Sequence, residues 1–224
     1  MSTPPVVAAF DLDGTLTDGG SVGRWLRFIA GNRPFLSAGL RLAPSLALGA
    51  VMSGRHADSA KEELFRKTLS GRNADEVRRL SEEFGLHHVA EELRPAVLNR
   101  LRWHQDQGHH TVVVSASPEI YVAVIAQELG AHGAIGTRLG IDPLGRLTGG
   151  YLGRNCRGEE KIRRLREWID EQHFASEPDI YAYGNSRGDR RLLRAATYPF
   201  DVGKLGRFGA LRNYPRLSSA ELPN

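Results

Sequence analysis

The chain contains little cysteine. Cys156 is the only one among 224 residues, so an intrachain disulfide is excluded. Chains without disulfides are typical of a reducing compartment. The first residues also lack a basic region followed by an apolar stretch, the pattern by which a secretory signal peptide is recognised. We therefore expect a cytoplasmic protein.

Long apolar runs are also missing. The longest apolar region covers residues 35–52, and Arg41 and Pro44 interrupt it. Its uninterrupted part, 46–52, is far shorter than the ~20 apolar residues that a membrane-spanning helix needs. Two interpretations of the region remain open. It is either a buried helical hairpin or an apolar lid that rests on an apolar substrate or on a membrane, which would give peripheral membrane contact.

Lysine is scarce, and the positive charge comes mainly from arginine. Four of the 30 basic side chains are lysines, the net charge is +4 and the sequence pI is about 9.4. Such a chain could meet nucleic acid, anionic lipid or a phosphorylated small molecule. The arginines are spread over expected helices without a basic stripe or a stacking motif, so we expect no nucleic-acid partner.

A long helical stretch separates the first two expected strands. Residues 5–10 form the first apolar run, and the next begins only at 111. Between them the pattern is helical, with helix-starting capping boxes at Ser59 and Asn73. About 90 residues is too long for a simple crossover, so we expect an inserted domain. The predicted division is a core formed by 1–18 and 108–224 and an all-helical cap domain formed by 19–107.

The second half of the chain alternates short apolar runs with helical patterns. Such alternation is typical of a parallel sheet with helices on both faces. Ser117 is expected to cap a helix that has Pro118 at its first position. We therefore predict an α/β fold, a doubly wound parallel sheet with the helical insertion. The expected strands are 111–114, 131–137, 179–183 and an edge strand 198–202; the expected helices are 118–129, 158–173 and 190–196; and a β-hairpin is expected over 139–152.

Polar residues follow three of the predicted strands at the point where each strand ends. Asp11 and Asp13 follow the first strand, Ser115 follows the second, and Asn185 and Asp189 come after a later one. Open α/β sheets bind ligands at the carboxyl ends of their strands. We therefore expect these side chains to share one site.

The combination of residues suits phosphoryl transfer, which needs a nucleophile, a cation and donors for the phosphate oxygens. Asp11 can attack phosphorus and form an aspartyl-phosphate. Asp13 can protonate the leaving alcohol and then deprotonate the hydrolytic water. The Ser115 hydroxyl and the backbone amides that follow it, beginning with that of Ala116, can bind phosphate oxygens. Lys161 can neutralise the phosphate charge and keep Asp11 ionised.

Asn185 and Asp189 supply hard oxygen ligands suited to Mg²⁺. Each of these residues has an ordinary explanation if taken alone: an Asp-x-Asp-Gly segment is usually a solvated turn, and Lys161 could be one more cation on an exposed helix. The combination is more specific. Each polar cluster follows an apolar strand, and one of only four lysines falls in the interval where the mechanism needs it.

These segments, in this order, resemble the haloacid dehalogenase superfamily of phosphatases. The likeness is strongest to the phosphoserine-phosphatase-like branch (subfamily IB), which has a helical cap between its first two motifs. The likeness spans residues 5 to about 200. Residues 10–17 are similar to the first motif, Ser115-Ala116-Ser117 to the second, Lys161 within 155–161 to the third, and 184–189 to the fourth.

The resemblance implies a role for each matching residue. It makes Asp11 the nucleophile and Asp13 the acid/base, and it implies Mg²⁺ bound by Asp11, by the backbone carbonyl of Asp13 and by the fourth motif, with Asn185 and Asp189. One position departs from the family pattern, because the fourth motif usually begins with aspartate and this chain has Asn185. An amide oxygen can still bind Mg²⁺, but one negative charge is lost.

The substrate is expected to be a phosphomonoester with an apolar part. The apolar region 35–52 and four arginines in and before it indicate more than a pocket for a small amino acid. We therefore hypothesise a lipid substrate such as a lysophospholipid or phosphatidylglycerol phosphate. The alternative is a phosphorylated small-molecule substrate that is polar, such as phosphoserine. The four arginines are Arg24, Arg27, Arg33 and Arg41.

Three other classes of protein are considered. A signalling receiver also carries acidic residues, a hydroxyl and a lysine on a parallel sheet, but its phosphorylated aspartate lies on a later strand and it lacks a helical insertion. A binding protein that keeps the fold without the chemistry is favoured only by Asn185. A cysteine phosphatase needs an arginine six positions after its nucleophile, and Ile162 stands six positions after Cys156.

Overall fold

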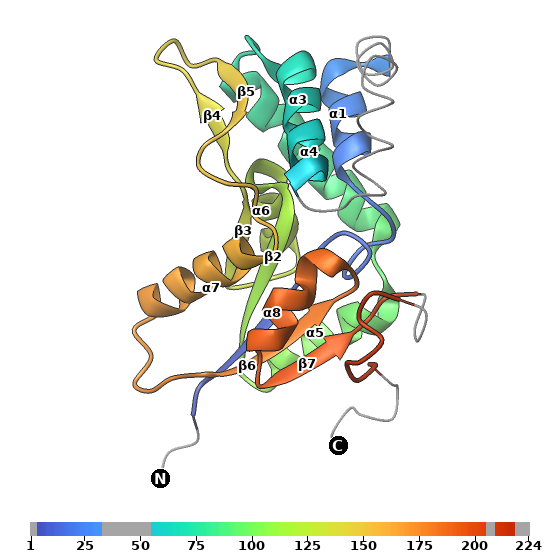
Figure 1. Cartoon of the computed structure of the whole chain (residues 1–224), viewed down its shortest axis with the longest axis vertical. Helices are drawn as coiled ribbons and strands as arrows, with labels where there is room; N and C mark the ends of the chain where they lie inside the picture. The colour runs from blue at the N-terminus through green and yellow to red at the C-terminus, as the bar shows by residue number, and fades with distance from the viewer. Residues whose placement is uncertain (1–3, 33–54, 205–208, 218–224) are drawn as a thin grey trace.

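A five-stranded parallel sheet forms the centre of the protein (Figure 1). The computed structural model describes residues 4–32, 55–204 and 209–217. The strands lie in the order β3-β2-β1-β6-β7, and each neighbouring pair is parallel. The predicted α/β fold is confirmed, including the edge position of the last strand. The strands are β1 Val6–Phe10, β2 His110–Pro118, β3 Gly133–Thr137, β6 Asp179–Gly184 and β7 Tyr198–Asp201.

Strand β1 lies in the middle of the sheet, and both of its faces are buried. Its sequence, Val-Val-Ala-Ala-Phe, has no polar residue, as expected of a strand covered on both sides. Ala8 and Phe10 pack into the core on one face, and Val7 and Ala9 pack into the core on the other. Strands β2 and β3 lie on one side of β1, and β6 and β7 lie on the other. The strand order therefore reverses at β1, and open α/β sheets bind ligands beside such a switch point.

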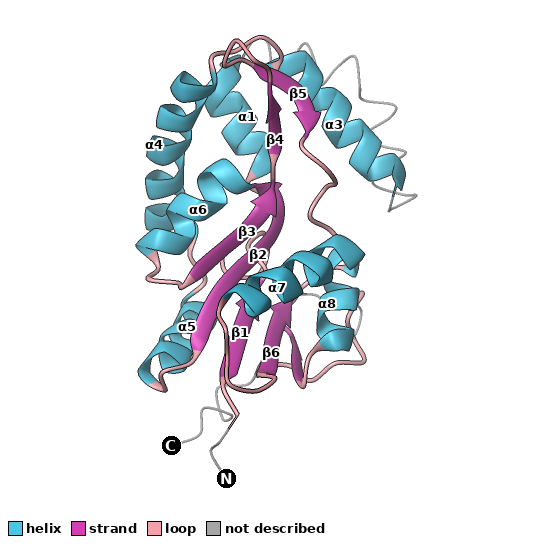
Figure 2. Ribbon diagram, turned by 90° about the vertical axis from the view of Figure 1, so that its left-hand side faces the viewer, coloured by secondary structure: helices cyan, strands magenta, loops and turns pink. Residues whose placement is uncertain are grey.

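Helices cover both faces of the sheet (Figure 2). On the face of Phe10, α5 and α6 contribute Leu101 and Val122 to the core. On the opposite face, α7 and α8 contribute Leu165 and Leu192. The sheet is therefore doubly wound, as predicted. The helices are α5 Pro95–Asp106, α6 Glu119–Glu128, α7 Glu159–Glu171 and α8 Arg190–Ala195, and a short 3-10 turn, η1 Arg187–Asp189, precedes α8.

In the described part of the chain, three further helices form a lobe above the carboxyl ends of the strands, which we call the helical lobe (Figure 1). The predicted β-hairpin is confirmed, and its strand β5 packs on helix α3 of this lobe. Gly149 makes that packing possible, because its φ is +78° and a Cβ there would lie 2.5 Å from the Cα of Arg66. The helices are α1 Val22–Ala30, α3 Arg55–Leu69 and α4 Ala74–Glu92, and the hairpin strands are β4 Leu139–Ile141 and β5 Leu147–Tyr151.

Two elements near the expected domain boundaries contact different parts of the protein. Helix α5 contacts β2 and so lies on the sheet, whereas the hairpin that follows β3 contacts α3. The division into a core of 1–18 and 108–224 and a cap of 19–107 stays a prediction. The apolar region 35–52 lies outside the described residues, as do Arg33 and Arg41. Among the described residues, no helix has both the length and the apolarity to cross a bilayer.

The structure corrects two expected helix starts and confirms a third. Asn73 caps α4, since its side-chain oxygen accepts hydrogen bonds from the amides of Asp75 and Glu76 at 2.9 and 3.0 Å. Ser59 does not cap a helix, because α3 begins at Arg55. Ser117 is not a helix cap either. Strand β2 runs on to Pro118 because it pairs with β3 up to that residue, and α6 begins after it.

Candidate active site

Asp11 and Asp13 leave the end of β1 in a tight turn at the centre of the sheet edge. Gly14 makes the turn possible in two ways. Its φ of +77° lies in the left-handed region, and a Cβ on this residue would lie only 2.0 Å from Nδ2 of Asn185. The loop after β6 can therefore approach the loop after β1. This approach brings the first and fourth predicted motifs together.

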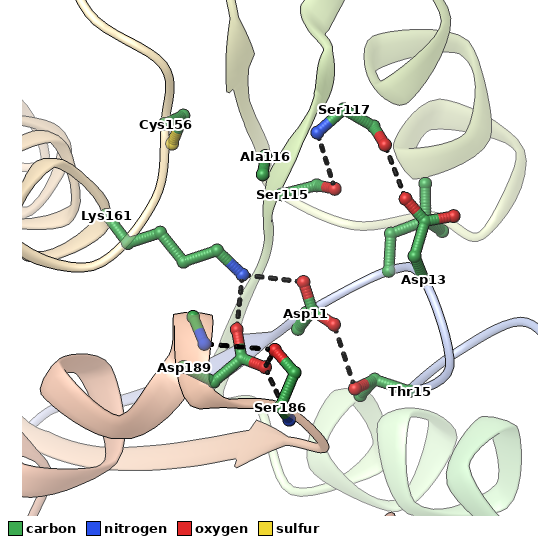
Figure 3. A network of polar contacts seen from close by, with 12 residues as sticks. Asp11, Asp13, Thr15, Ser115, Ala116, Ser117, Cys156, Lys161, Ser186 and Asp189 are labelled. Atoms are coloured by element: carbon green, nitrogen blue, oxygen red, sulfur yellow. Dashed lines mark hydrogen bonds and ion pairs between the residues drawn. The ribbon is translucent and has the colours of Figure 1, made fainter. Parts of the chain in front are cut away.

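Lys161 joins two of the predicted acidic residues. It lies in the first turn of α7, and its Nζ donates to Oδ1 of Asp11 at 2.6 Å and to Oδ1 of Asp189 at 2.6 Å (Figure 3). All three side chains are buried. A buried ammonium keeps its charge only when anionic partners compensate it. The carboxylates from the ends of β1 and β6 supply that compensation.

The three buried charges change one another's proton affinity. Burial raises the pKa of Asp11 to about 7, and the negative charge of Asp189 adds to the rise, although Lys161 opposes it. Burial acts to raise the pKa of Asp189 as well, but the charge and hydrogen bond of Lys161, together with the hydrogen bonds from Ser186, outweigh burial and lower that pKa. Burial acts to lower the pKa of Lys161, but the two carboxylates raise it. Two carboxylates thus share one ammonium, and a further cation near Asp11 would balance the charge.

Asp11 and Asn185 direct oxygens to the same place. The hydroxyl of Thr15 lies 3.0 Å from Oδ2 of Asp11 and 3.4 Å from Oδ1 of Asn185. A carboxylate oxygen and an amide oxygen are ligands of the kind that Mg²⁺ prefers, and bound water can complete its coordination. The donor set therefore fits Mg²⁺, although it brings less negative charge than two carboxylates would. In the described parts of the chain, no group of three or more His, Cys, Asp or Glu side chains is arranged to hold a metal ion.

Asp189 uses both of its carboxylate oxygens within the protein. Oδ1 accepts from Lys161, and Oδ2 accepts from the amide of Ser186 at 3.0 Å and from its hydroxyl at 2.7 Å. The amide of Asn185 donates to the same oxygen at 3.3 Å. Asp189 therefore holds the loop after β6 in shape. Its predicted part as a metal ligand stays a prediction.

Asp13 is fixed by residues of other elements. The backbone amide of Ser21 donates to its Oδ1 at 2.6 Å. The hydroxyl of Ser117 donates to its Oδ2 (Figure 3). The Ser21 hydroxyl in turn lies 2.7 Å from the hydroxyl of Tyr121. The carboxylate is thus oriented from the start of the helical lobe and from the end of β2. Such fixed orientation is what proton transfer to a substrate requires.

A small cavity brings the predicted residues together. It has a volume of about 100 Å³, and two of its lining residues, Arg157 and Gly188, also line a wider hollow of about 830 Å³. Asn185 is the one predicted residue outside the lining, and it reaches the site through Thr15. A groove of about 600 Å³ between α7 and α8 contains none of the predicted residues. The cavity is lined by Asp11, Asp13, Ser115, Ala116, Arg157, Lys161, Ser186, Gly188 and Asp189.

Several residues at the site were missed from the sequence. Thr15 and Ser117 lie within the short segments that carry Asp11 and Ser115, so their position in those segments was a usable signal. Arg157 likewise lies within the segment 155–161 that carries Lys161. Ser21 has no such signal. It reaches the site because the start of the helical lobe folds over it, and such a contact leaves no local pattern in the sequence.

The chain is similar to known proteins over most of its length. The sequence profile of haloacid dehalogenase-like hydrolases matches residues 8–194. Protein CicA of Caulobacter vibrioides is 36% identical over 199 residues, which cover 88% of this chain and 85% of that protein. The histidinol-phosphatase of Neisseria meningitidis serogroup C is 26% identical over 198 residues, which cover 88% of this chain and 89% of that enzyme.

The fold is also found in a solved structure. A protein of unknown function from Bordetella pertussis Tohama I superposes with a TM-score of 0.79 at 25% identity, covering 96% of this chain and 99% of that one. The matched residues 8–194 include every residue that lines the cavity, among them Asp11, Ser115, Lys161 and Asp189. The chain therefore belongs to the haloacid dehalogenase-like hydrolase family.

Proposed function

We propose that this protein is a Mg²⁺-dependent phosphomonoester hydrolase that acts through an aspartyl-phosphate on Asp11. The observation that carries the proposal is the ammonium of Lys161, 2.6 Å from both Asp11 and Asp189, in the cavity that Ser115 and Asp13 also line. The residues that we propose as nucleophile, acid and phosphate ligands thus line one small cavity. The name of the histidinol-phosphatase relative supports a phosphatase activity.

Asp11 and Asp13 would carry out the bond changes. A carboxylate oxygen of Asp11 attacks phosphorus, the bond from phosphorus to the leaving oxygen breaks, and Asp13 gives its proton to that oxygen. Asp13 then takes a proton from a water molecule that attacks the same phosphorus. The bond between Asp11 and phosphorus breaks, and inorganic phosphate is released. The hydrogen bonds from Ser21 and Ser117 hold Asp13 for both proton transfers.

Phosphate would be bound by uncharged donors and one cation. Ser115 and Ala116 belong to β2 near its end, and they line the same cavity as Lys161. The ligands proposed for Mg²⁺ are Asp11, the carbonyl of Asp13, Asn185 and Asp189. A bound Mg²⁺ would offset the negative charge of the phosphate and of Asp11.

We also place the protein in the phosphoserine-phosphatase-like branch, with residues 19–107 as its cap. The helical lobe lies above the strand ends, and its helix α3 lines the wider hollow with Asp58 and Glu62. Arg154 and Arg157 line the same hollow. This charged lining favours a small polar phosphomonoester over a lipid phosphate. The lipid hypothesis, with its peripheral membrane contact, rests on region 35–52.

Hydrolysis of para-nitrophenyl phosphate by the purified protein tests the proposal. We expect turnover with Mg²⁺, loss of turnover in EDTA, and loss of turnover in Asp11→Asn. Asp75→Asn is the matched control, because Asp75 is exposed at the start of α4. Turnover that needs no metal, or an Asp11→Asn variant as active as the wild type, would contradict it.

A panel of phosphomonoesters then separates the substrate classes. It should include histidinol phosphate and phosphoserine as polar esters. The lipid esters are a lysophospholipid with a terminal phosphomonoester and phosphatidylglycerol phosphate in vesicles. We expect the highest kcat/KM with a small polar ester. A higher kcat/KM with the lipid esters would contradict this expectation and favour the lipid hypothesis.

A further inference from the structure

A lysine of the helical lobe contacts the backbone of the phosphate-binding segment. Lys61 lies on α3, and its Nζ donates to the carbonyl oxygen of Ala116 at 2.6 Å and to Oδ1 of Asn155 at 3.1 Å. Lys61 itself does not line the small cavity. We propose that Lys61 is a positioning residue for phosphate binding, which acts through the peptide between Ala116 and Ser117. The inference rests on the proposed function, because it concerns the same phosphate site.

A chain of hydrogen bonds leads from Lys61 to the cavity. The carbonyl of Ala116 and the amide of Ser117 belong to one peptide unit, and that amide donates to Oγ of Ser115 at 3.0 Å. Ser115 therefore accepts a hydrogen bond from the protein. Among the described residues its own proton has no acceptor, so it is free to donate to a phosphate oxygen in the cavity that Ser115 lines.

The ammonium of Lys61 polarises every hydrogen bond of this series in the same direction. An ammonium that donates to a carbonyl draws electrons from the peptide, which makes its N–H a stronger donor. The Ser117 amide in turn makes the Ser115 hydroxyl a stronger donor. Each bond thus points from the ammonium of Lys61 towards the place of the phosphate. A hydroxyl held and polarised in this way binds an anion better than a freely rotating one.

Thr137 cannot replace Lys61 in this arrangement. Its hydroxyl lies 2.6 Å from the same Ala116 carbonyl and 2.8 Å from Oδ1 of Asn155. A hydroxyl has only one proton, so it can satisfy only one of these acceptors at a time. The ammonium of Lys61 has three protons and serves both. Lys61 is thus the donor that can serve the Ala116 carbonyl and Asn155 together, and the one that brings a positive charge to that carbonyl.

The surroundings of Lys61 leave its charge available to the peptide. Both of its described hydrogen-bond acceptors are uncharged. The rings of Phe65 and Tyr151 lie 5.5 and 5.8 Å from Nζ and help to exclude water. Burial lowers the pKa of Lys61 to about 8, while the charges of Asp13 and Asp58 oppose the fall. The side chain is therefore mainly charged at neutral pH.

A purely structural role makes a different prediction. Asn155 also donates to Oδ1 of Asp58 at 2.6 Å, so Lys61 and Asp58 of α3 both reach the loop before α7. If Lys61 only joined the lobe to that loop, its loss would lower the melting temperature and leave phosphate affinity unchanged. Phosphate affinity is the readout that separates the two roles.

The test compares neutral variants of Lys61 with a control on the same helix. Lys61→Met removes the charge and the donors, Lys61→Gln keeps an N–H without the charge, and Lys67→Met removes an exposed lysine that pairs with Glu63. The inhibition constant of inorganic phosphate is measured against para-nitrophenyl phosphate, with KM, kcat and melting temperature. Phosphate binding in the presence of Mg²⁺ is measured independently by calorimetry.

We expect Lys61→Met to raise the phosphate inhibition constant and KM about tenfold, Lys61→Gln to raise them less, and Lys67→Met to leave them within twofold. A folded Lys61→Met protein with an inhibition constant within twofold of the wild type would overturn the inference. If Lys61→Met does not fold, an inhibition constant of Lys61→Gln within twofold of the wild type would overturn the inference instead. A wild-type protein that binds phosphate without hydrolysing esters would overturn the proposed function alone, and calorimetry would still decide the role of Lys61.

Discussion

Asp11 and Lys161 are 150 positions apart in the chain, and their side chains meet at 2.6 Å in the core. Asp11 directly follows the central strand, and Lys161 lies in the first turn of α7. The contact therefore depends on the packing of α7 across the sheet. It also means that the charges of the site are part of the stability of the fold.

Loss of Lys161 should damage both stability and activity. Lys161→Met leaves Asp11 and Asp189 buried without a cation, and breaking a buried ion pair in this way costs about 3–5 kcal/mol. We expect a free energy of unfolding lower by about that amount in urea titrations, together with loss of ester hydrolysis. Lys204→Met is the control, because Lys204 is exposed, and it should change neither property. A Lys161→Met protein as stable as the wild type would contradict the compensation of charge described above.

Alanine substitutions at Gly14 and Gly71 distinguish the cost of backbone strain from the cost of a steric clash. Both have a positive φ, +77° and +80°, but a Cβ at Gly14 would meet Asn185 at 2.0 Å, whereas a Cβ at Gly71 would have no atom within 4 Å. Gly71→Ala should cost about 1–2 kcal/mol from strain alone and keep activity. Gly14→Ala should cost more and abolish activity, because it pushes Asn185 away from Asp11. Equal losses of stability in urea would show that the contact with Asn185 does not matter.

Asn185 should limit the affinity for Mg²⁺. Asn185→Asp adds a carboxylate beside the oxygen of Asp11, and metal affinity rises with the number of charged ligands. We expect half-maximal activity at a Mg²⁺ concentration roughly tenfold lower than in the wild type. Without metal, the extra negative charge should lower the melting temperature, and Mg²⁺ should reverse that effect. An unchanged Mg²⁺ dependence would argue that Asn185 is not a ligand.

Asp11 should make the metal-free protein less stable as the pH rises. Its pKa is raised to about 7 from the 3.8 of a free carboxyl, so the folded state binds a proton that the unfolded state has released. The favourable contribution is complete below about pH 4 and is lost as the pH rises through 7. Asp189, whose pKa is lowered, loses its contribution only below about pH 4.

Buried histidines have the opposite effect on the pH dependence of stability. The measurement that isolates Asp11 is therefore the difference in stability between Asp11→Asn and the wild type. The pKa of His104 falls to about 3 through burial, which makes stability rise with pH up to about 6.5. Asp11→Asn leaves the histidines in place. In urea titrations in EDTA, the stability of Asp11→Asn relative to the wild type should increase between pH 5 and 8. A constant difference over that range would mean that Asp11 does not titrate there.

Local sequence patterns predicted those helices, strands and turns whose conformation depends on residues close by in the sequence. The run Val-Val-Ala-Ala-Phe gave β1, the Asn73 cap gave the start of α4, and the glycine-rich hairpin was found as expected. The prediction for Ser117 was wrong because its partner is distant. Ser followed by Pro is a common helix start, but pairing with β3 keeps the segment extended up to Pro118. The Ser117 hydroxyl then donates to Asp13 instead of capping a helix.

The amino-acid sequence by itself determined the fold class, the order of strands and helices, and the acidic residues that follow β1, because hydrophobic periodicity and turn residues act over a few positions. Only the tertiary structure decided that Asp189 holds its own loop and shares Lys161 with Asp11, that Ser21 and Ser117 orient Asp13, and that Lys61 reaches the Ala116 carbonyl. These contacts join segments brought together by the packing of helices on the sheet and of the helical lobe above it. Their distances follow from burial of the whole core, which no short stretch of the chain encodes.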